Sequence, residues 1–451
     1  ITHTTSSTSA MDSIASLITS PVQPWDGLIC TSTSVRDNVQ VILQAEANAM
    51  QQRLGATKLV LPEIPVIPLG IHTEDFEYSA DQRTAARKYL DVSDNTLVVL
   101  YMGRLSFHAK AHPLAMYQSL QQASEVTKKE VLLVECGWYA NDNIKDAFAD
   151  AAKMVAPNVR VVTLDGREEQ NREIAWAGAD VFCSLSDNIQ ETFGITPLEA
   201  MAAGLPVVVT DWDGYRDTVR HEVDGFRVPT LAPAPGLLSD LAQRHALDID
   251  TYDMYCCLNS SLVAVNSIAL TNAFTALFNS PELRKKMGDA GRARAREDYD
   301  WKTIIARYEQ FWFGLNEKRI RTKVNKDEAS ESRKSRSVSN IPAASQWPAR
   351  LDPSVGFSSY PTRQLNGDTL LQLSVDASES AILLAKLKTL TMVNCAEIIF
   401  PTDAEINQVL NDASMSPQKA STIISKIEES RKPLLLRSLA WLCKLGVLTF
   451  S

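Results

Sequence analysis

One stretch in the middle of the chain constrains the fold most, because it changes from strand-like to helix-like sequence and back. Residues 179–185 (ADVFCSL) are apolar and predict a buried strand, and residues 186–188 (SDN) predict a loop. Pro197 can open a helix, because proline is tolerated in a first turn, and Gly204 is a natural stop. Residues 205–210 (LPVVVT) predict a second buried strand. This order is typical of a parallel α/β sheet.

Two glutamates flank the loop-to-helix turn, Glu191 at its start and Glu199 within the first turns of the helix. In parallel α/β units this turn faces the ligand crevice and presents unpaired N–H groups. The N–H groups of Phe193, Gly194 and Ile195 therefore predict an anion site that favours phosphate. Glu199 can accept hydrogen bonds from a vicinal diol such as a ribose. The spacing is equally compatible with an ordinary turn that carries two surface glutamates.

The alternation of strand and helix continues on both sides of this unit. Residues 131–136 (VLLVEC) and 159–164 (VRVVTL) predict buried strands, and residues 173–178 predict a helix. The longest stretch without charge, residues 254–281, contains too many Asn, Ser and Thr residues for a membrane span. Its apolar residues recur at helical spacing, which predicts a core-facing helix.

The Glu-x7-Glu stretch with Phe-Gly resembles the donor-site signature of glycosyltransferase family 4, the group 1 retaining enzymes of the GT-B fold. Residues 97–113 (LVVLYMGRLSFHAKAHP) are similar to the family's strand, Gly-Arg and Lys. Residues 66–76 (VIPLGIHTEDF) resemble its interdomain crossover, and residues 282–312 resemble its closing helices. The resemblance covers roughly residues 1–315. It implies an α/β protein with a Rossmann-like parallel-sheet donor domain.

The resemblance assigns roles to the donor-site residues. It implies that Arg104, which follows Gly103, and Lys110 grip the donor diphosphate. Glu199 then binds the ribose hydroxyls, and Glu191 binds the transferred sugar near its 3- and 4-hydroxyls. The amides of Phe193, Gly194 and Ile195 add fixed dipoles to this charge, so no metal or other cofactor is expected.

Two positions in this part of the chain qualify the resemblance. Arg104 and Lys110 are six positions apart, whereas a spacing one residue shorter is commoner in the family. His108 and His112 therefore remain alternatives to Lys110. Gly137 ends a predicted strand where the family has a loop beside the donor, and it joins the predicted donor-binding residues.

The first residues (ITHTTSS) resemble a strand end whose histidine lies near the donor phosphate and the reacting sugar, which makes His3 a catalytic candidate. Alternatively, His3 only approaches a helix that residues 4–9 cap. Residues 27–32 predict the last strand of an amino-terminal domain, followed by a helix. Because a whole domain precedes the crossover in the family, residues 1–65 predict a remnant of the acceptor-side domain. This polypeptide alone is then expected to bind nucleotide but to transfer sugar poorly.

The composition changes after the donor domain, which the sequence places at residues 66–315. Residues 316–336 carry eight Lys or Arg against four acids, and the segment 316–355 predicts a flexible, basic linker. Residues 356–451 predict a small helical module that resembles a winged helix. Its four predicted helices and one predicted strand are 380–393, 403–413, 417–429, 433–445 and the terminal VLTF. Nine basic and nine acidic residues favour protein interaction or self-association over nucleic-acid binding.

Charge and cysteine usage exclude several classes of protein. A net charge of −9 argues against a nucleic-acid protein, and seven cysteines without ligand-like spacing predict free thiols in a reducing compartment. We therefore expect a cytoplasmic protein whose membrane contact is peripheral at most, at the inner membrane face.

Two functions from different classes stay open. The first is a retaining transferase that moves a hexose from a nucleotide-diphosphate sugar to a sugar or lipid-linked acceptor. The second is a non-catalytic nucleotide-sugar-binding or scaffold protein.

Overall fold

The computed structural model describes residues 1–451 except residues 3, 332–351, 396 and 451. Contacts divide the chain into two compact units, Ile1–Val338 and Ser339–Ser451. The first unit contains the predicted donor site, and the second contains the predicted helical module.

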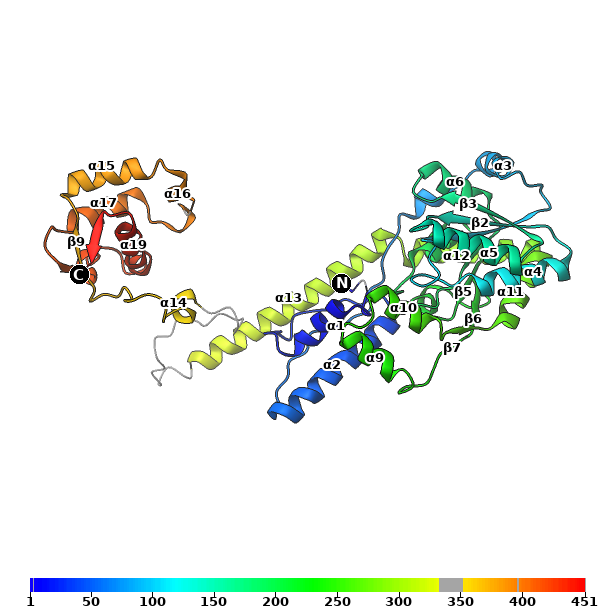
Figure 1. Ribbon diagram of the computed structural model, residues 1–451, viewed down its shortest axis with the longest axis horizontal. Coiled ribbons are helices and arrows are strands. Elements are labelled where there is room, and N and C mark those ends of the chain that lie inside the picture. The colour runs from blue at the N-terminus through cyan, green and yellow to red at the C-terminus, as the bar shows by residue number, and fades with distance from the viewer. Residues whose placement is uncertain (3, 332–351, 396, 451) are drawn as a thin grey trace. The chain divides into compact units, whose positions relative to one another are not determined.

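A six-stranded parallel sheet organises the first unit, in the order β3-β2-β1-β4-β5-β6 (Figure 1). This is the order of the Rossmann fold, in which the strand order reverses between β1 and β4. Ligands bind in such sheets at the carboxyl ends of the strands beside that reversal. The bounds are β1 Leu97–Met102, β2 Val131–Gly137, β3 Val159–Asp165, β4 Val181–Ser184, β5 Val207–Thr210 and β6 Gly225–Val228.

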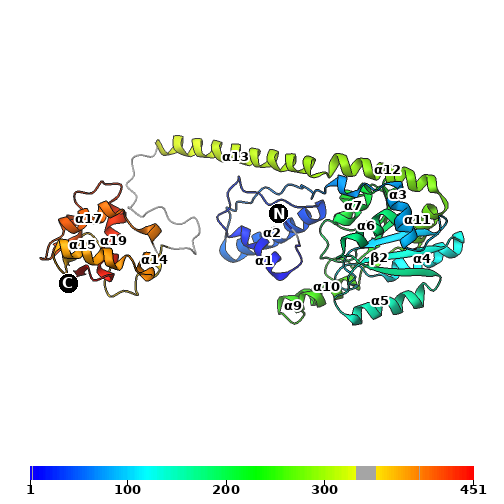
Figure 2. The same ribbon diagram turned by 90° about the horizontal axis from the view of Figure 1, so that it is seen from above.

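Helices cover both faces of the sheet (Figure 1, Figure 2). The central strands β1, β2, β4 and β5 are mostly apolar and are buried at every position, as expected for a sheet covered on both sides. One core joins the sheet to α4 Leu114–Thr127, α5 Asp142–Val155 and α11 Ser267–Asn279. The second core joins it to α3 Ala80–Tyr89, α6 Glu169–Gly178, α7 Ile195–Ala202 and α12 Pro281–Asp298. The predicted α/β architecture is confirmed.

The amino-terminal segment consists mainly of helices. It contains α1 Thr8–Ala15, a 3₁₀ turn at Ser16–Ile18 and α2 Thr33–Leu54. The strand predicted at 27–32 is reduced to isolated parallel bridges, Gly27 with Glu63 and Cys30 with Val66, while the helix predicted after it is present. A strand needs a continuous ladder, and here only single residue pairs meet.

The amino-terminal end of α2 is fixed on the donor domain by two carboxylates. The Ser32 hydroxyl donates to Asp213 Oδ1 over 3.1 Å, and the Thr33 N–H donates to Asp217 Oδ2 over 2.6 Å. Acceptors at this end satisfy free helix N–H groups and favour the helix dipole. Asp217 lies in the short helix α8 Tyr215–Thr218.

The connection between β6 and α11 folds into a helical excursion. It contains β7 Thr230–Leu231, α9 Ser239–Ala246, α10 Tyr252–Ser260 and β8 Ala264–Val265. Both views place α1 next to α9 and α10 (Figure 1, Figure 2). Ser6 Oγ lies 2.7 Å from the Tyr252 hydroxyl, and Thr8 Oγ1 lies 3.1 Å from His245 Nε2. The excursion therefore holds the start of the chain.

The crossover and the end of the first unit meet at the edge of the domain. The crossover includes the 3₁₀ turn Thr73–Phe76, and Asp300 accepts a hydrogen bond from the Thr73 hydroxyl over 2.6 Å. Helix α13 then spans Trp301–Glu331. The first part of the segment predicted as a flexible linker is thus helical, and residues 332–351 lie outside the described part.

The second unit is a small helical fold with its own core (Figure 1). Its helices are α14 Pro353–Gly356, α15 Ala377–Leu387, α16 Thr391–Asn394, α17 Asp403–Asp412, α18 Ala420–Ile423 and α19 Lys432–Lys444, with a 3₁₀ turn at Glu397–Ile399. Its sheet has the order β10-β9-β11, with β9 Leu370–Leu373, β10 Gln418–Lys419 and β11 Leu448–Phe450.

Most elements of this unit follow the predicted pattern, with two corrections. The single helix predicted at 380–393 is split into α15 and α16, because residues 388–390 are not helical. Thr402 caps α17 through a capping box with Glu405. The helix predicted at 417–429 is wrong for most of its length, because residues 418–419 pair with β9 instead and only 420–423 are helical. Among the helices that the structure describes, none is long and apolar enough to cross a membrane.

Candidate functional site

The loop after β1 carries Arg104 at the reversal point of the sheet. Tyr101 is buried in the strand, and its hydroxyl donates to the Arg104 carbonyl over 3.0 Å. The Arg104 guanidinium donates to Gln190 Oε1 over 2.8 Å, across the crevice between the β1 and β4 loops. Arg104 is therefore held by hydrogen bonds at its backbone carbonyl and at its guanidinium, although its side chain is exposed.

Gly103 and Gly137 meet where β1 and β2 end. A Cβ atom on Gly137 would lie 1.9 Å from the Gly103 carbonyl oxygen and would clash with it, so this position requires glycine. The two predicted donor-binding glycines are thus adjacent, and Gly137 lets the two loops approach each other.

Asn188 joins the two donor loops. Its side chain is buried, donates to the His108 carbonyl over 2.9 Å and accepts from the Gln190 N–H over 2.9 Å. The Trp212 indole N–H donates to the Asn188 carbonyl over 3.1 Å. These bonds set the position of the β1 loop, which carries Lys110, against the β4 loop, which carries Glu191.

Glu191 is the most engaged carboxylate of the site. Its carboxylate forms an ion pair with the Lys110 ammonium and accepts the N–H groups of Thr192, over 3.3 Å, and Phe193. Burial raises the pKa of Glu191, but Lys110 and these amides outweigh it, so that its pKa lies below the usual range. Glu191 is ionised at neutral pH.

Gly194 makes the turn from this loop into α7. Its φ is +76°, and a Cβ atom there would lie 1.9 Å from Cε1 of the fully buried Tyr215. A side chain is excluded on both grounds. The turn positions Phe193, which is buried, before Ile195, the first residue of α7.

Glu199 lies within α7, and its surroundings differ from those of Glu191. Burial raises its pKa to about 7, and the charge of Arg172 lowers it only in part. Arg172 donates to the carbonyls of Gly166 and Arg167, over 2.9 and 3.1 Å. The same cation therefore fixes the turn after β3 and lies near the predicted ribose ligand.

One cavity brings together four of the predicted site residues. It measures about 230 Å³ and is lined by Gly103, Arg104, Ala109, Lys110, Gln190, Glu191 and Thr196. His108 and His112, the alternatives to Lys110, do not line it. The geometry thus favours Lys110 over both histidines. Glu199, Phe193, Gly194, Ile195 and Gly137 are also outside its lining, and His3 lies outside the described residues.

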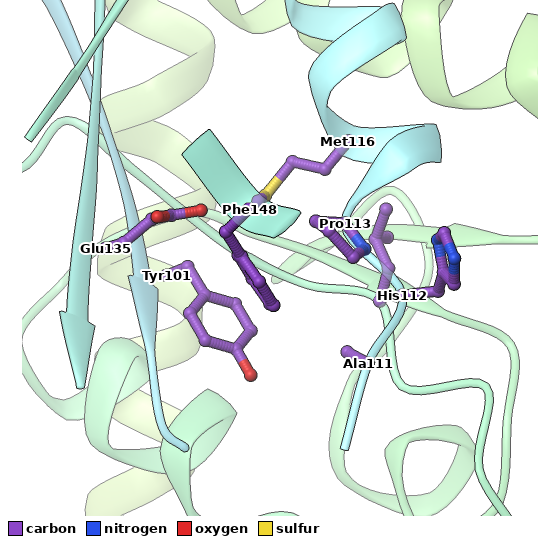
Figure 3. Close-up of a pocket in the computed structure, with 8 residues that line it drawn as sticks. Tyr101, Ala111, His112, Pro113, Met116, Glu135 and Phe148 are labelled. Atoms are coloured by element: carbon purple, nitrogen blue, oxygen red, sulfur yellow. The ribbon is translucent and has the colours of Figure 1, made fainter. Parts of the chain in front are cut away.

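A second, much smaller cavity lies behind the β1 loop (Figure 3). It measures about 10 Å³, which leaves room for about one water molecule and no larger ligand. Figure 3 shows Tyr101 and Phe148 between Glu135 on one side and His112 on the other. Burial raises the pKa of Glu135 to about 7, and the Tyr117 hydroxyl donates to Glu135 Oε1 over 2.5 Å. This carboxyl supports the wall of the site without opening into it.

Sequence reasoning missed the residues that hold the site together. Asn188 and Gln190 bond to the β1 loop, about eighty residues away in the chain. Tyr101 and Arg172 fix nearby turns through bonds to residues three and six positions away. The available signal was the run of polar residues in the loop predicted at 186–188. Within the described ranges, no group of three or more His, Cys, Asp or Glu residues is arranged to hold a metal ion.

The part of the chain that contains the β1 loop and the β4 loop is similar in sequence to known proteins. Residues 82–234 match the sequence model of the family described as "Glycosyl transferases group 1". An uncharacterized glycosyltransferase of Methanocaldococcus jannaschii is 27% identical over 168 residues, which are 37% of this chain and 41% of that protein. The phosphatidyl-myo-inositol mannosyltransferase of Mycobacterium leprae is 31% identical over 140 residues, 31% of this chain and 28% of that protein.

Solved structures of similar architecture include Anabaena HepE in complex with UDP and glucose. The TM-score is 0.42 at 18% identity, covering 62% of this chain and 61% of that one. The chain spans less than half the length of both curated relatives. The matched family segment contains the β1 loop, the β4 loop and α7, and supports the glycosyltransferase superfamily that the sequence indicated.

Proposed function

We propose that this chain binds a nucleoside diphosphate sugar and serves a retaining glycosyltransferase that moves a hexose to a hydroxyl of a sugar or lipid-linked acceptor. One observation supports this most. Arg104 and Lys110 face Gln190 and Glu191 around one cavity, at the point where the strand order of the sheet reverses.

The charges at this cavity suit a diphosphate leaving group. As the bond to the sugar breaks, negative charge develops on the diphosphate, and a fixed guanidinium and ammonium stabilise it. Arg104 is held in place by Gln190 before the reaction, so little reorganisation is needed. We propose that these two cations and the amides before α7 supply the positive charge, without a metal ion.

We propose the retaining stereochemical course that the family resemblance implies. In the proposed mechanism the acceptor hydroxyl attacks from the face that the diphosphate leaves, through a short-lived oxocarbenium-like state. Glu191 is engaged by Lys110 and two amides, so we assign it to sugar orientation instead of covalent attack. Glu199, at the other end of the motif, is assigned to the ribose.

The test measures binding and turnover with the full chain. UDP-glucose and GDP-mannose are titrated by calorimetry, and donor hydrolysis or transfer is then assayed. We expect Glu199→Ala to weaken donor binding, and Arg104→Ala to cut turnover by about a hundredfold, as for one lost charge-stabilising donor. Lys285→Ala, an exposed change on α12, is the matched control.

The outcomes separate the two open functions. Unchanged binding and kinetics in both site variants would refute the assigned site. Donor binding without hydrolysis or transfer would favour the non-catalytic scaffold. In either case we propose a cytoplasmic protein whose second unit, with its own core and balanced charges, contacts a protein partner or a second copy.

A further inference from the structure

The carboxylate of Glu191 occupies groups that the proposed donor site needs for its diphosphate. The Lys110 ammonium forms an ion pair with this carboxylate, and the N–H groups of Thr192 and Phe193 also donate to it. Lys110 and Phe193 are two of the groups assigned to the phosphates. An anion of the chain itself is therefore bound at a site predicted for an anionic ligand.

The engagement is strong because the carboxylate is well shielded from water. The Glu191 side chain is only 8% exposed, and that of Lys110 is 25% exposed. A buried carboxylate is stable only when it is paired and hydrogen-bonded, and Glu191 has both kinds of partner. The neighbouring Asp213 is itself partly buried, and the negative charge of Glu191 acts on it. An unpaired Glu191 would thus face repulsion in addition to desolvation.

A diphosphate cannot share all of these groups with Glu191. The ammonium of a lysine has three donors, but each backbone amide has one. A phosphate oxygen that bonds to the Phe193 N–H must therefore displace the carboxylate. Two anions around the same ammonium also repel each other.

We propose that Glu191 is an internal substitute for the donor diphosphate, which holds Lys110 and the amides before α7 until the donor displaces it towards the sugar. The proposal rests on the proposed function and deepens it. A complete donor offers sugar hydroxyls that give the displaced carboxylate new hydrogen-bond donors. A diphosphate without a sugar offers none, so the site discriminates against the sugar-free product.

The test uses inorganic pyrophosphate, which carries the diphosphate charge without a base or a sugar. Its affinity for the full chain is measured by calorimetry for the wild type, Glu191→Gln and Glu191→Ala. Glu297→Gln, an exposed change of the same charge on α12, is the control. We expect both Glu191 variants to bind pyrophosphate about tenfold more tightly than the wild type, because a competing charge-assisted contact is removed. The control should bind as the wild type does.

The same variants should lose transfer from UDP-glucose or GDP-mannose, because the sugar contact is lost. A role in sugar contact alone would leave pyrophosphate affinity unchanged, so that affinity is the deciding readout. If the wild type binds pyrophosphate and both variants bind it equally or more weakly, the internal substitute is refuted while the proposed donor site stands. If no form binds pyrophosphate or either nucleotide sugar, the donor site and the inference fail together. Circular dichroism establishes that each variant is folded.

Discussion

The two glutamates at the ends of the motif have the same side chain and opposite surroundings. Glu191 is paired with Lys110 and two amides, and its pKa lies below the usual range. Glu199 is partly buried, has no comparable ion-pair partner among the described residues, and its pKa rises to about 7. Burial acts in the same direction on both carboxyls, so the partners decide the difference.

The comparison shows that one motif can carry two carboxylates that respond differently when a ligand binds. An engaged carboxylate must exchange its partners when a ligand arrives, whereas an unengaged one gains partners and becomes easier to ionise. Glu191 faces the loop after β1, and Glu199 faces the arginine that fixes the turn after β3. The division of roles between sugar and ribose is consistent with this arrangement.

The largest effect is expected from Lys110→Met, which makes Glu191 resemble Glu199. The variant leaves a buried carboxylate without its cation, so we expect the free energy of unfolding to fall by about 3 kcal/mol at pH 7. In the wild type the pKa of Glu191 is lower in the folded than in the unfolded state. The Lys110–Glu191 pair therefore stabilises the fold above the unfolded pKa, and this stabilisation is lost as the pH falls and Glu191 is protonated. The difference between the proteins should therefore shrink in acid, below about pH 4.

Urea unfolding at several pH values measures this difference. Lys285→Met removes an exposed lysine on α12 and should change the free energy of unfolding by less than about 0.5 kcal/mol. Equal stability of Lys110→Met and the wild type at pH 7 would contradict the engagement of Glu191.

A smaller effect of opposite sign is expected from Glu199→Gln. The folded pKa of about 7 lies above the unfolded value, so the wild type loses stability as pH rises from about 4.5 to 7. Glutamine does not ionise, so the free energy of unfolding of the variant should be about 2 kcal/mol higher than that of the wild type at pH 8. At pH 4 the two free energies should be equal. Urea unfolding across this range checks the prediction, with Glu297→Gln as control. A constant difference at every pH would show that Glu199 does not titrate as described.

The smallest effect is expected from Arg172→Gln, which sharpens the contrast between the carboxyls. Arg172 lowers the pKa of Glu199 only in part, so its loss should raise that pKa by less than about one unit. The upper limit of the pH range in which the protein loses stability should move upwards by the same amount, while the lower limit stays at the unfolded pKa, as measured by urea unfolding. Arg319→Gln, an exposed change on α13, should leave the range unchanged. A downward shift would mean that another group controls Glu199.

Much of the fold could be predicted because the signals are local. Apolar runs at 131–136 and 159–164 and the glycine and proline around 195–204 carry the information for β2, β3 and α7. Prediction was poorer where distant partners decide. Residues 418–419 lie in a segment with helical apolar spacing but pair with β9, and residues 27–32 have a strand-like sequence but form only isolated bridges.

The candidate site divides in the same way. The motif identified Arg104, Lys110 and Glu191, which the structure brings to one cavity. It did not identify Asn188 or Gln190, because their role is to bond segments about eighty residues away. The assignment of every donor contact remains a prediction that the proposed titrations test.

The sequence by itself determined most strands and helices of the donor domain, the loop-to-helix turn between the two glutamates, and the residue types available to bind a diphosphate. Periodicity, backbone freedom and charge are properties of neighbouring residues, so they can be read along the chain. Only the tertiary structure decided that Lys110 meets Glu191 and that Glu199 has no such cation. Ionisation depends on burial and on charges a few ångströms away, and those distances exist only after the chain has folded.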